Sequence, residues 1–298
     1  MTKSLSESIN QLAPEVAEFF DEDTHTFSYV VCDPTSSSCA IIDSVWNLDY
    51  ASGGLNSYSA DNIIGYIESN DLDVEWIIET HVHADHVSAA SYIKNALGGK
   101  IAISAEISVV QETFAKVFNE DKDFPCDGSQ FDYLFEDNEA YKIGNLEAIA
   151  LHTPGHTPAC MTHLIGDAAF VGDTIFMPLG GTARADFPGG SANHLYDSIQ
   201  KILSLPGETR LFMCHDYSPE RPDLAFESSV IEESEFNIHV NSKVAKNKFV
   251  EMREARDQTL DMPRYILPSL QINMRAGHLP DPEDNGLSYL KIPINAFK

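Results

Sequence analysis

The sequence predicts an α/β fold, because short β-rich runs alternate with segments of helical spacing over the first two-thirds of the chain. Residues 25–33 and 39–45 are apolar runs on either side of the turn-forming PTSSS, which is typical of a strand pair. Residues 60–70 have helical spacing, 74–80 are strand-like, and 87–99 show a helical pattern that glycines stop. This order indicates helices layered on a sheet.

Strands dominate the middle of the chain. A strand is predicted over 100–106, and the segment 141–176 contains strand after strand separated by glycine turns. A helix over 194–205 and a final strand over 209–217 follow. The pattern again favours alternating layers and not a helical bundle.

The chain beyond residue 217 differs from the preceding part in composition and in the spacing of its apolar residues. It is first polar with helical spacing and then irregular and punctuated by proline, without a low-complexity linker. We therefore predict a core over 20–217 and a helical and irregular C-terminal extension over 218–298 that packs on the core as part of the same structural domain.

Composition and charge exclude several classes of partner. No apolar run approaches the roughly 20 residues of a membrane-spanning helix, and the N-terminal segment lacks the apolar centre of a secretory signal, so we predict a cytoplasmic protein with no membrane partner. The formal net charge of −27 would repel phosphate backbones, which argues against nucleic acid. The five cysteines are odd in number and scattered, which predicts free thiols.

Three histidines and an aspartate crowd into the stretch HVHADH, directly after the strand over 74–80. In an extended chain alternate side chains point the same way, so His81 and His83 can converge, and Asp85 and His86 follow where the chain must turn. Imidazole and carboxylate are ligands of zinc and of non-heme iron. Local hydrogen bonding could explain one such histidine but explains four clustered groups poorly, so the stretch predicts half of a metal site.

Further ligands are expected at other strand ends. The sequence offers His156 in the turn LHTPGHTPAC, Asp173 in FVGDTIF, and His215 in LFMCHDY. Each is a weak signal alone. The remaining histidines have patterns more typical of packed or surface side chains: His25, His152, His163, His194, His239 and His278.

The order of these motifs, H-x-H-x-D-H, then TPGHT, then GD, then a strand ending in histidine, resembles the metallo-β-lactamase superfamily over about residues 25–217. The resemblance implies an αββα sandwich with a metal site at one edge of two facing sheets. It also implies two general ligand sets, with Asp173 between them. These sets are His81, His83 and His156 for a first metal, and Asp85, His86 and His215 for a second.

Within that superfamily, the loop GTARADF, the tail NMRAG and the run CHDY look like the persulfide dioxygenases. That branch implies one Fe(II) per chain, held by His81, His156 and Asp173, with zinc as a substitute. A 2-His-1-carboxylate face leaves room for a substrate sulfur and O2. The implied reaction converts glutathione persulfide, O2 and water to glutathione and sulfite. His83, Asp85, His86 and His215 would then orient the ligands or complete a second metal site.

Glutathione is anionic whereas the chain is acidic, so local positive groups are needed. Arg184 and Arg275 are the candidates, since an arginine fork pairs with carboxylates, and Tyr217 and Asn273 are hydrogen-bonding candidates. For Arg275 a structural salt bridge is a comparable interpretation. A homodimer and a separate sulfurtransferase partner stay open.

The main rival is a hydroxyacylglutathione hydrolase-like enzyme, a dinuclear zinc or iron hydrolase of glutathione thioesters. It shares the histidine pattern, and it ranks second because the tail lacks the Lys/Arg-rich clamp typical of that branch. A lactonase or β-lactamase ranks lower. A non-catalytic metal-binding or sulfide-sensing protein is disfavoured because all ligand positions and the arginine loop are present.

Overall fold

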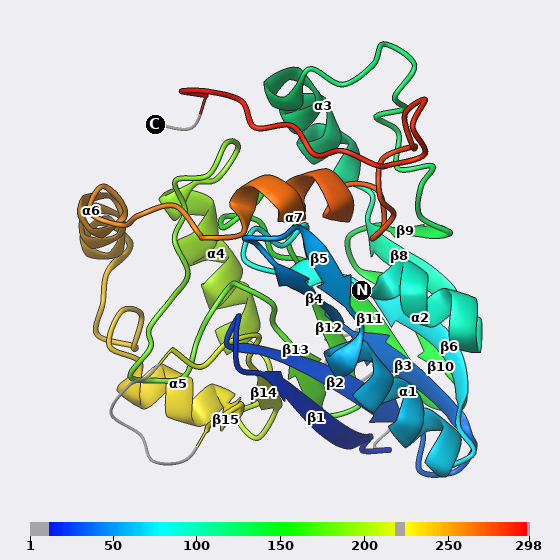
Figure 1. Cartoon of the computed structure of the whole chain (residues 1–298). Coiled ribbons are helices and arrows are strands. Elements are labelled where there is room, and N and C mark those ends of the chain that lie inside the picture. The colour runs from blue at the N-terminus through cyan, green and yellow to red at the C-terminus, as the bar shows by residue number, and fades with distance from the viewer. Residues whose placement is uncertain (1–11, 218–223, 297–298) are drawn as a thin grey trace.

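The computed structural model describes residues 12–217 and 224–296. Two six-stranded sheets lie face to face and helices cover their outer faces, as Figure 1 shows. This is the predicted αββα sandwich. The predicted boundary between residues 217 and 218 adjoins a segment that lies outside the described residues, so the division into core and extension stays a prediction.

The first sheet has the order β1-β2-β3-β6-β8-β9. β2 lies inside it and all seven of its residues are buried, in keeping with the β-branched and aromatic residues of its sequence TFSYVVC. The bounds of its strands are β1 Glu15–Asp21, β2 Thr26–Cys32, β3 Ser38–Ile42, β6 Asp73–Ile78, β8 Lys100–Ser104 and β9 Tyr133–Phe135. A small three-stranded sheet beside it has the order β5-β4-β7, with bounds β4 Val45–Asp49, β5 Gly54–Asn56 and β7 Val87–Ser88.

The second sheet has the order β10-β11-β12-β13-β14-β15. Its pairs are antiparallel except β13 with β14, which run parallel. That parallel pair brings the ends of β13 and β14 to the same edge of the sheet. The bounds are β10 Glu139–Ile143, β11 Leu146–His152, β12 Met161–Ile165, β13 Ala168–Phe170, β14 Arg210–Phe212 and β15 Glu227–Ser229.

Apolar side chains fill the space between the sheets. Tyr29 of the first sheet packs against Phe170 and Phe212 of the second, with ring centroids 5.3 and 5.4 Å apart. The alternate residues of the same strands point outward, where Val30 and Ile41 join a separate cluster under the helices. The period of two along the strands therefore builds two cores from one sequence.

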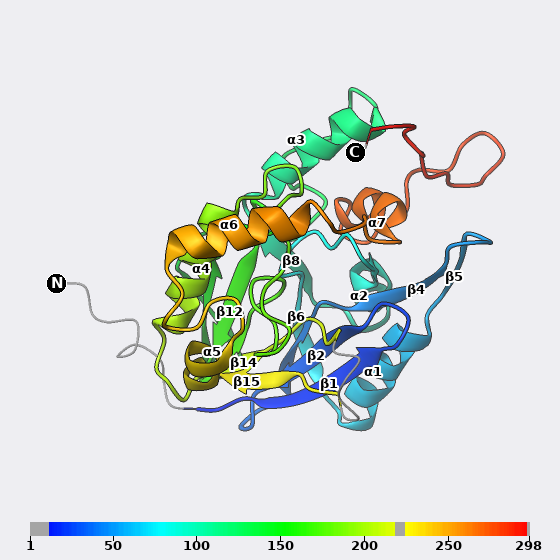
Figure 2. The ribbon, with the colours of Figure 1, turned by 90° about the vertical axis from the view of Figure 1, so that its left-hand side faces the viewer.

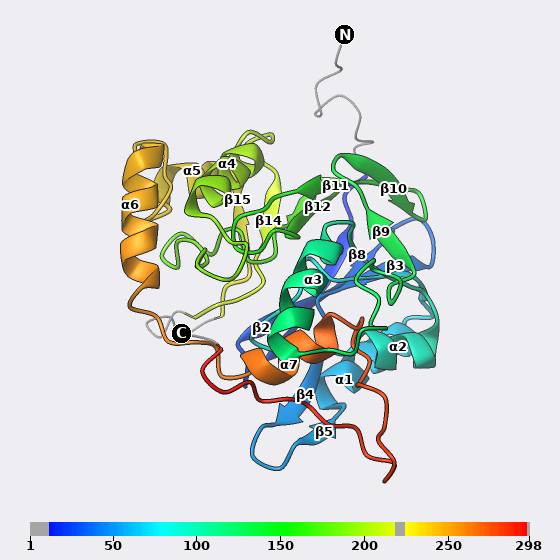
Figure 3. The same cartoon turned by 90° about the horizontal axis from the view of Figure 1, so that it is seen from above.

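The helices divide between the two outer faces, as Figures 2 and 3 show from two further directions. Helices α1, α2, α3 and α7 share the apolar cluster of the first sheet, and α4, α5 and α6 share that of the second. Their bounds are α1 Tyr58–Ser69, α2 Ala90–Leu97, α3 Ile107–Phe118, α4 Ala192–Leu203, α5 Val230–Phe236, α6 Lys246–Asp257 and α7 Ile266–Asn273.

The C-terminal helices contact both halves of the sandwich. Helix α6 packs beside α4, and α7 packs beside β7 and α3. Among the described residues, no helix is long and apolar enough to cross a membrane. The tail after α7 is irregular in the structure, as its prolines predict.

Candidate metal centre

The predicted ligands come from four separate strand ends and meet at one edge of the sandwich. The loop between β6 and β7 carries the HVHADH stretch, and His156 lies in the turn between β11 and β12. Asp173 follows β13 and His215 follows β14, as the parallel pairing of these strands requires. All of these side chains are buried except Asp85, which is partly exposed.

The two sheets are joined where His215 lies. Thr26 at the start of β2 forms an isolated antiparallel bridge with His215, and the Phe27 amide donates to the Cys214 carbonyl at 2.8 Å. The His215 ring nitrogen Nδ1 lies 3.0 Å from the His25 carbonyl oxygen. The first sheet thus fixes a ligand that belongs to the second.

Asp173 lies between the two groups of ligands. Its Oδ2 faces His81 Nε2 at 4.0 Å and His156 Nε2 at 3.7 Å. Its Oδ1 faces His215 Nε2 at 3.3 Å, and the same nitrogen lies 3.1 Å from Asp85 Oδ2. One carboxylate can therefore contribute to two neighbouring metal positions.

The other ring nitrogen of each histidine is held by the protein. A carbonyl oxygen only accepts, so the contact of His156 Nδ1 with the Arg184 carbonyl at 2.8 Å places a proton on Nδ1 and leaves Nε2 free. The His25 carbonyl likewise places a proton on His215 Nδ1, so that Nε2 is the nitrogen that faces Asp85 and Asp173. His83 is held in the opposite sense, since its Nε2 lies 2.9 Å from Asp43 Oδ1 and leaves Nδ1 free. Such outer contacts fix ring orientation in metal sites.

The free atoms of these residues fit metal ions. Within the described residues, six buried polar atoms of the cluster lack a hydrogen-bond partner, and each is a ligand type for zinc or iron. The compact groups of possible ligands among the described residues include His81, His156 and Asp173, and also His83, Asp85 and His86. The unpartnered atoms are His81 Nε2, His83 Nδ1, Asp85 Oδ2, His86 Nε2, Asp173 Oδ1 and His215 Nε2.

We expect metal binding to release protons and to strengthen as pH rises. Burial would lower the pKa of His215, but the carboxylates of Asp173 and Asp85 raise it to about 10. Metal-free protein therefore holds a proton on His215 at neutral pH, and a metal must displace it. In the chelated protein this protonation stabilises the fold fully below about pH 6.5, and that stabilisation is lost as pH rises through about 10.

Calorimetric titration with zinc at pH 7 in two buffers of different ionisation enthalpy measures the proton release. His215→Gln should release fewer protons than the unmodified chain. Equal heats in both buffers, after correction for zinc–buffer binding, would contradict the assigned protonation.

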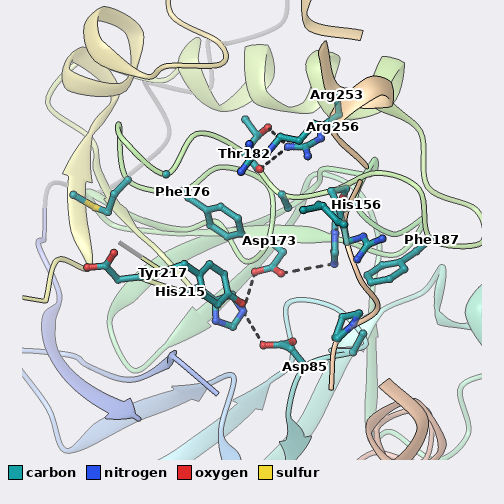
Figure 4. Close-up of a pocket in the computed structure, with 18 of the residues that line it drawn as sticks. Asp85, His156, Asp173, Phe176, Thr182, Phe187, His215, Tyr217, Arg253 and Arg256 are labelled. Atoms are coloured by element: carbon teal, nitrogen blue, oxygen red, sulfur yellow. Dashed lines mark hydrogen bonds and ion pairs between the residues drawn. The ribbon is translucent and has the colours of Figure 1, made fainter. Parts of the chain in front are cut away.

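A pocket of about 670 Å³ opens over the metal centre. Its floor contains Asp85, His156, Asp173 and His215, and Figure 4 shows Arg253 and Arg256 on the opposite side from Asp85. The walls between them are mainly apolar: Phe176, Met177, Leu179, Phe187, Ile238, Leu260 and Pro263. This volume suits a ligand of the size of a small peptide.

Two of the four predicted substrate-binding residues line this pocket. Tyr217 is half-exposed, and its ring stacks on His215 with centroids 4.9 Å apart. Arg184 also lines the pocket, but its fork pairs with both oxygens of Asp186 at 2.6 and 2.9 Å and donates to the Asp261 carbonyl. Its guanidinium also lies over Phe187, 4.8 Å from the ring centroid. The anion-binding role of Arg184 stays a prediction, and an anion would compete with Asp186.

The other two predicted substrate-binding residues are not among those that line the described pocket. Arg275 pairs with Glu120 at 2.7 Å and lies over Phe124, which corresponds to the structural interpretation of this arginine. Asn273 holds the ligand loop instead, because its amide donates to the carbonyls of His83 and His86 and its Oδ1 accepts from the Ser88 amide. The geometry thus gives both residues tasks other than contact with a ligand in this pocket.

Sequence reasoning missed the two arginines of α6. Arg253 and Arg256 line the pocket, although the tail was expected to lack a basic clamp. The signal was present in REARD, where helical spacing puts the two arginines on neighbouring positions of one face. Within the described residues Arg256 forms no ion pair, and it is exposed.

A model of one protein family matches residues 21–215, and its description is the metallo-beta-lactamase superfamily. The chain belongs to the metallo-β-lactamase superfamily. The matched range contains every predicted metal ligand.

Relatives in this superfamily carry more than one kind of name. A probable metallo-hydrolase of Burkholderia pseudomallei is 52% identical over 95% of this chain and 99% of its own length, and glyoxylase B2 of Dictyostelium discoideum is 46% identical over 94% and 97%. The mitochondrial persulfide dioxygenase of Homo sapiens is 27% identical over 87% of each chain. The two more similar relatives thus have the names of a hydrolase and a glyoxylase, and the less similar one has the name of a dioxygenase.

A solved structure shares the fold. ETHE1 from Myxococcus xanthus superposes with a TM-score of 0.70, at 24% identity, over 89% of this chain and all of that one. The predicted sandwich is therefore confirmed by the shared fold, and the membership in the superfamily by the family match.

Proposed function

We propose that this chain is a metal-dependent hydrolase that cleaves thioesters of an anionic thiol of the glutathione type. The observation that carries the proposal is the position of Asp173, whose two oxygens face two sets of ligands. Following the ligand sets that the resemblance implies, His81, His83 and His156 would hold one metal ion. Asp85, His86 and His215 would hold the second. When bound, such a pair of ions polarises a carbonyl and activates water for attack.

The pocket supports an elongated, amphipathic substrate. Its apolar walls can cover a thioester and exclude bulk water, while Tyr217 offers a hydroxyl near the floor. Arg256, on the opposite side, can pair with a carboxylate of the substrate. This arrangement would place the scissile bond above Asp173 and the anionic end at α6.

The names of the more similar relatives also support hydrolysis. The Burkholderia relative is called a probable metallo-hydrolase, and the Dictyostelium relative is called a glyoxylase. Both align with nearly the whole of this chain, including α6 and α7. A shared substrate class is consistent with this extent of similarity.

A persulfide dioxygenase is the second candidate. His81, His156 and Asp173 form a compact group of two histidines and one carboxylate, which suits a single Fe(II) with open positions. The human relative named persulfide dioxygenase is 27% identical, and the GTARADF and NMRAG stretches resemble that branch. This reaction would use the same pocket and the same anionic thiol carrier.

The two functions are separated by loading metal-free protein anaerobically with Fe(II), Zn(II) or both. Each form is given S-lactoylglutathione, with release of thiol measured, and separately glutathione persulfide with O2, with oxygen uptake and sulfite measured. Thioester cleavage by the zinc or mixed form, without iron-dependent uptake, is the expected result. Iron-dependent uptake with sulfite, and no thioester cleavage, would replace the hydrolase proposal with the dioxygenase. Asp173→Ala protein serves as the inactive control in both assays.

Arg256→Ala is expected to raise KM for the glutathione substrate about tenfold with little change in kcat, because it removes a charged contact remote from the reacting bond. Steady-state kinetics check this. The matched control is Lys246→Ala, which removes another cation of α6 that pairs with exposed Asp197. An unchanged KM in the Arg256 variant would remove this residue from the substrate site.

A further inference from the structure

Helix α6 carries a buried ion pair next to the loop that follows Asp173. Arg253 and Asp257 are spaced i,i+4, and their guanidinium and carboxylate are 2.5 Å apart at the closest atoms. Both side chains are almost fully buried. A pair of this kind costs desolvation and is weak evidence of stabilisation by itself, so its partners outside the helix matter.

Those partners all lie in the segment 182–186. Arg253 donates from Nη1 to the Thr182 carbonyl at 3.0 Å. Asp257 accepts at Oδ2 from the Ala185 amide at 2.9 Å. The pair therefore forms hydrogen bonds with the backbone on both sides of Arg184.

The carbonyl of Arg184 is the acceptor for His156 Nδ1. Its direction is set by the peptide plane it shares with the Ala185 amide, and that amide is the donor to Asp257. A single peptide unit thus connects α6 on one side with a candidate metal ligand on the other. If the Ala185 amide loses its acceptor, the same plane can rotate and the Arg184 carbonyl turns away from His156.

We propose that Arg253 and Asp257 are positioning residues that hold the Arg184–Ala185 peptide so that His156 carries its proton on Nδ1 and presents Nε2 to a metal. The pair belongs to the C-terminal extension and acts on the core through hydrogen bonds alone. The proposal rests on His156 being a ligand, and it is independent of whether the centre hydrolyses thioesters or oxygenates persulfides.

The other end of the loop has its own supports, which makes the effect local. Asn237 donates from Nδ2 to the Gly181 carbonyl at 3.0 Å, and the Thr182 amide donates to His239 Nδ1 at 3.0 Å. Loss of the ion pair should therefore leave the loop in place at Gly181 and free it at Ala185. A general loosening of α6 would not produce this difference between Gly181 and Ala185.

The test uses the full chain with Arg253→Met and Asp257→Leu combined, since replacing both members of a buried pair by apolar residues leaves no unpaired charge. Asp257→Asn is the second variant. Both oxygens of Asp257 accept a hydrogen bond, one from Arg253 and one from the Ala185 amide, and the asparagine NH2 group cannot accept either of them. Removal of the exposed Lys246–Asp197 pair by Lys246→Ala is the matched control on the same helix. Zinc affinity is measured by competition with a chromogenic chelator, and the His156 tautomer by ¹⁵N NMR of the metal-free protein.

We expect about 10–100-fold weaker zinc binding in both Asp257 variants, the range typical for loss of an outer-shell contact, with the control unchanged. The His156 signals should move from the Nδ1-protonated tautomer toward a mixture. Wild-type zinc affinity with an unchanged tautomer in either folded variant would overturn the proposal, as would an equal loss in the control. None of these readouts involves a substrate, so failure of the proposed hydrolase activity would not affect them.

Discussion

Replacing Asp173 with alanine is expected to remove metal binding and activity together. Oδ2 of this residue serves the His81–His156 side and Oδ1 serves the His215 side, so one substitution affects both groups. Loss of an outer-shell contact alone typically costs 10–100-fold, and loss of a carboxylate shared between two metals should reduce activity by more than about 100-fold. Metal content by mass spectrometry and steady-state rates on the same samples test this.

The matched control is Asp167→Ala. Asp167 lies just before β13, is exposed, and pairs with Arg210, so its loss should leave metal content and rate near wild type. Full activity with bound metal in the Asp173 variant would show that the assignment of this ligand is wrong.

Asn273→Ala is expected to destabilise the protein by roughly 3 kcal/mol, since it leaves three buried backbone groups without partners at about 1 kcal/mol or more each. Two of those groups are the carbonyls of His83 and His86. Freeing them loosens the ligand loop, so metal occupancy should fall along with stability.

Denaturant unfolding of zinc-loaded and chelated protein separates these two effects. The stabilisation by zinc should be smaller in the Asn273 variant than in the unmodified chain. Asn285→Ala, in the exposed tail, is the control and should match wild type in both forms. An Asn273 variant with normal stability and metal content but a raised KM would instead support the predicted substrate-binding role of this residue.

Most of the fold was predictable because the spacing of apolar residues along the chain indicates which segments form strands and which form helices. Each strand and helix predicted between residues 25 and 217 overlaps an element of the structure. The bounds differ most at the last strand, which was predicted over 209–217 and covers only Arg210–Phe212, and residues 87–88, predicted as helix, form β7. Strands β1, β4, β5, β7 and β9 and helix α3 were not predicted. β1 is a partly exposed edge strand, and β5, β7 and β9 have only two or three residues each. In α3 the buried Ile107, Phe114 and Phe118 do have helical spacing, and this signal was overlooked.

The candidate ligands were also predictable, because imidazole and carboxylate side chains at strand ends are unusual in this pattern. Residue type and order were enough for the resemblance that the family match later confirmed. The residues that contact a substrate were harder to predict than the metal ligands. Arg184 carries a suitable charge, yet in the structure its fork is occupied by Asp186, two residues away. Arg256 was overlooked because it lies 83 positions after Asp173, in a helix whose sequence is polar on nearly all sides.

The sequence by itself therefore determined the layered α/β architecture, the superfamily and the set of groups able to bind a metal. Only the tertiary structure decided which ring nitrogen of each histidine is free, that Asp173 faces both groups of ligands, and that Asn273 supports the ligand loop. It also decided that α6 supplies two of the three arginines that line the pocket. The physical reason is that periodicity and motif spacing are local properties of the chain. Hydrogen-bond direction is set only when the sheets and the C-terminal helices pack. The same packing brings together distant segments, such as those of His83 and Asn273, which are 190 residues apart.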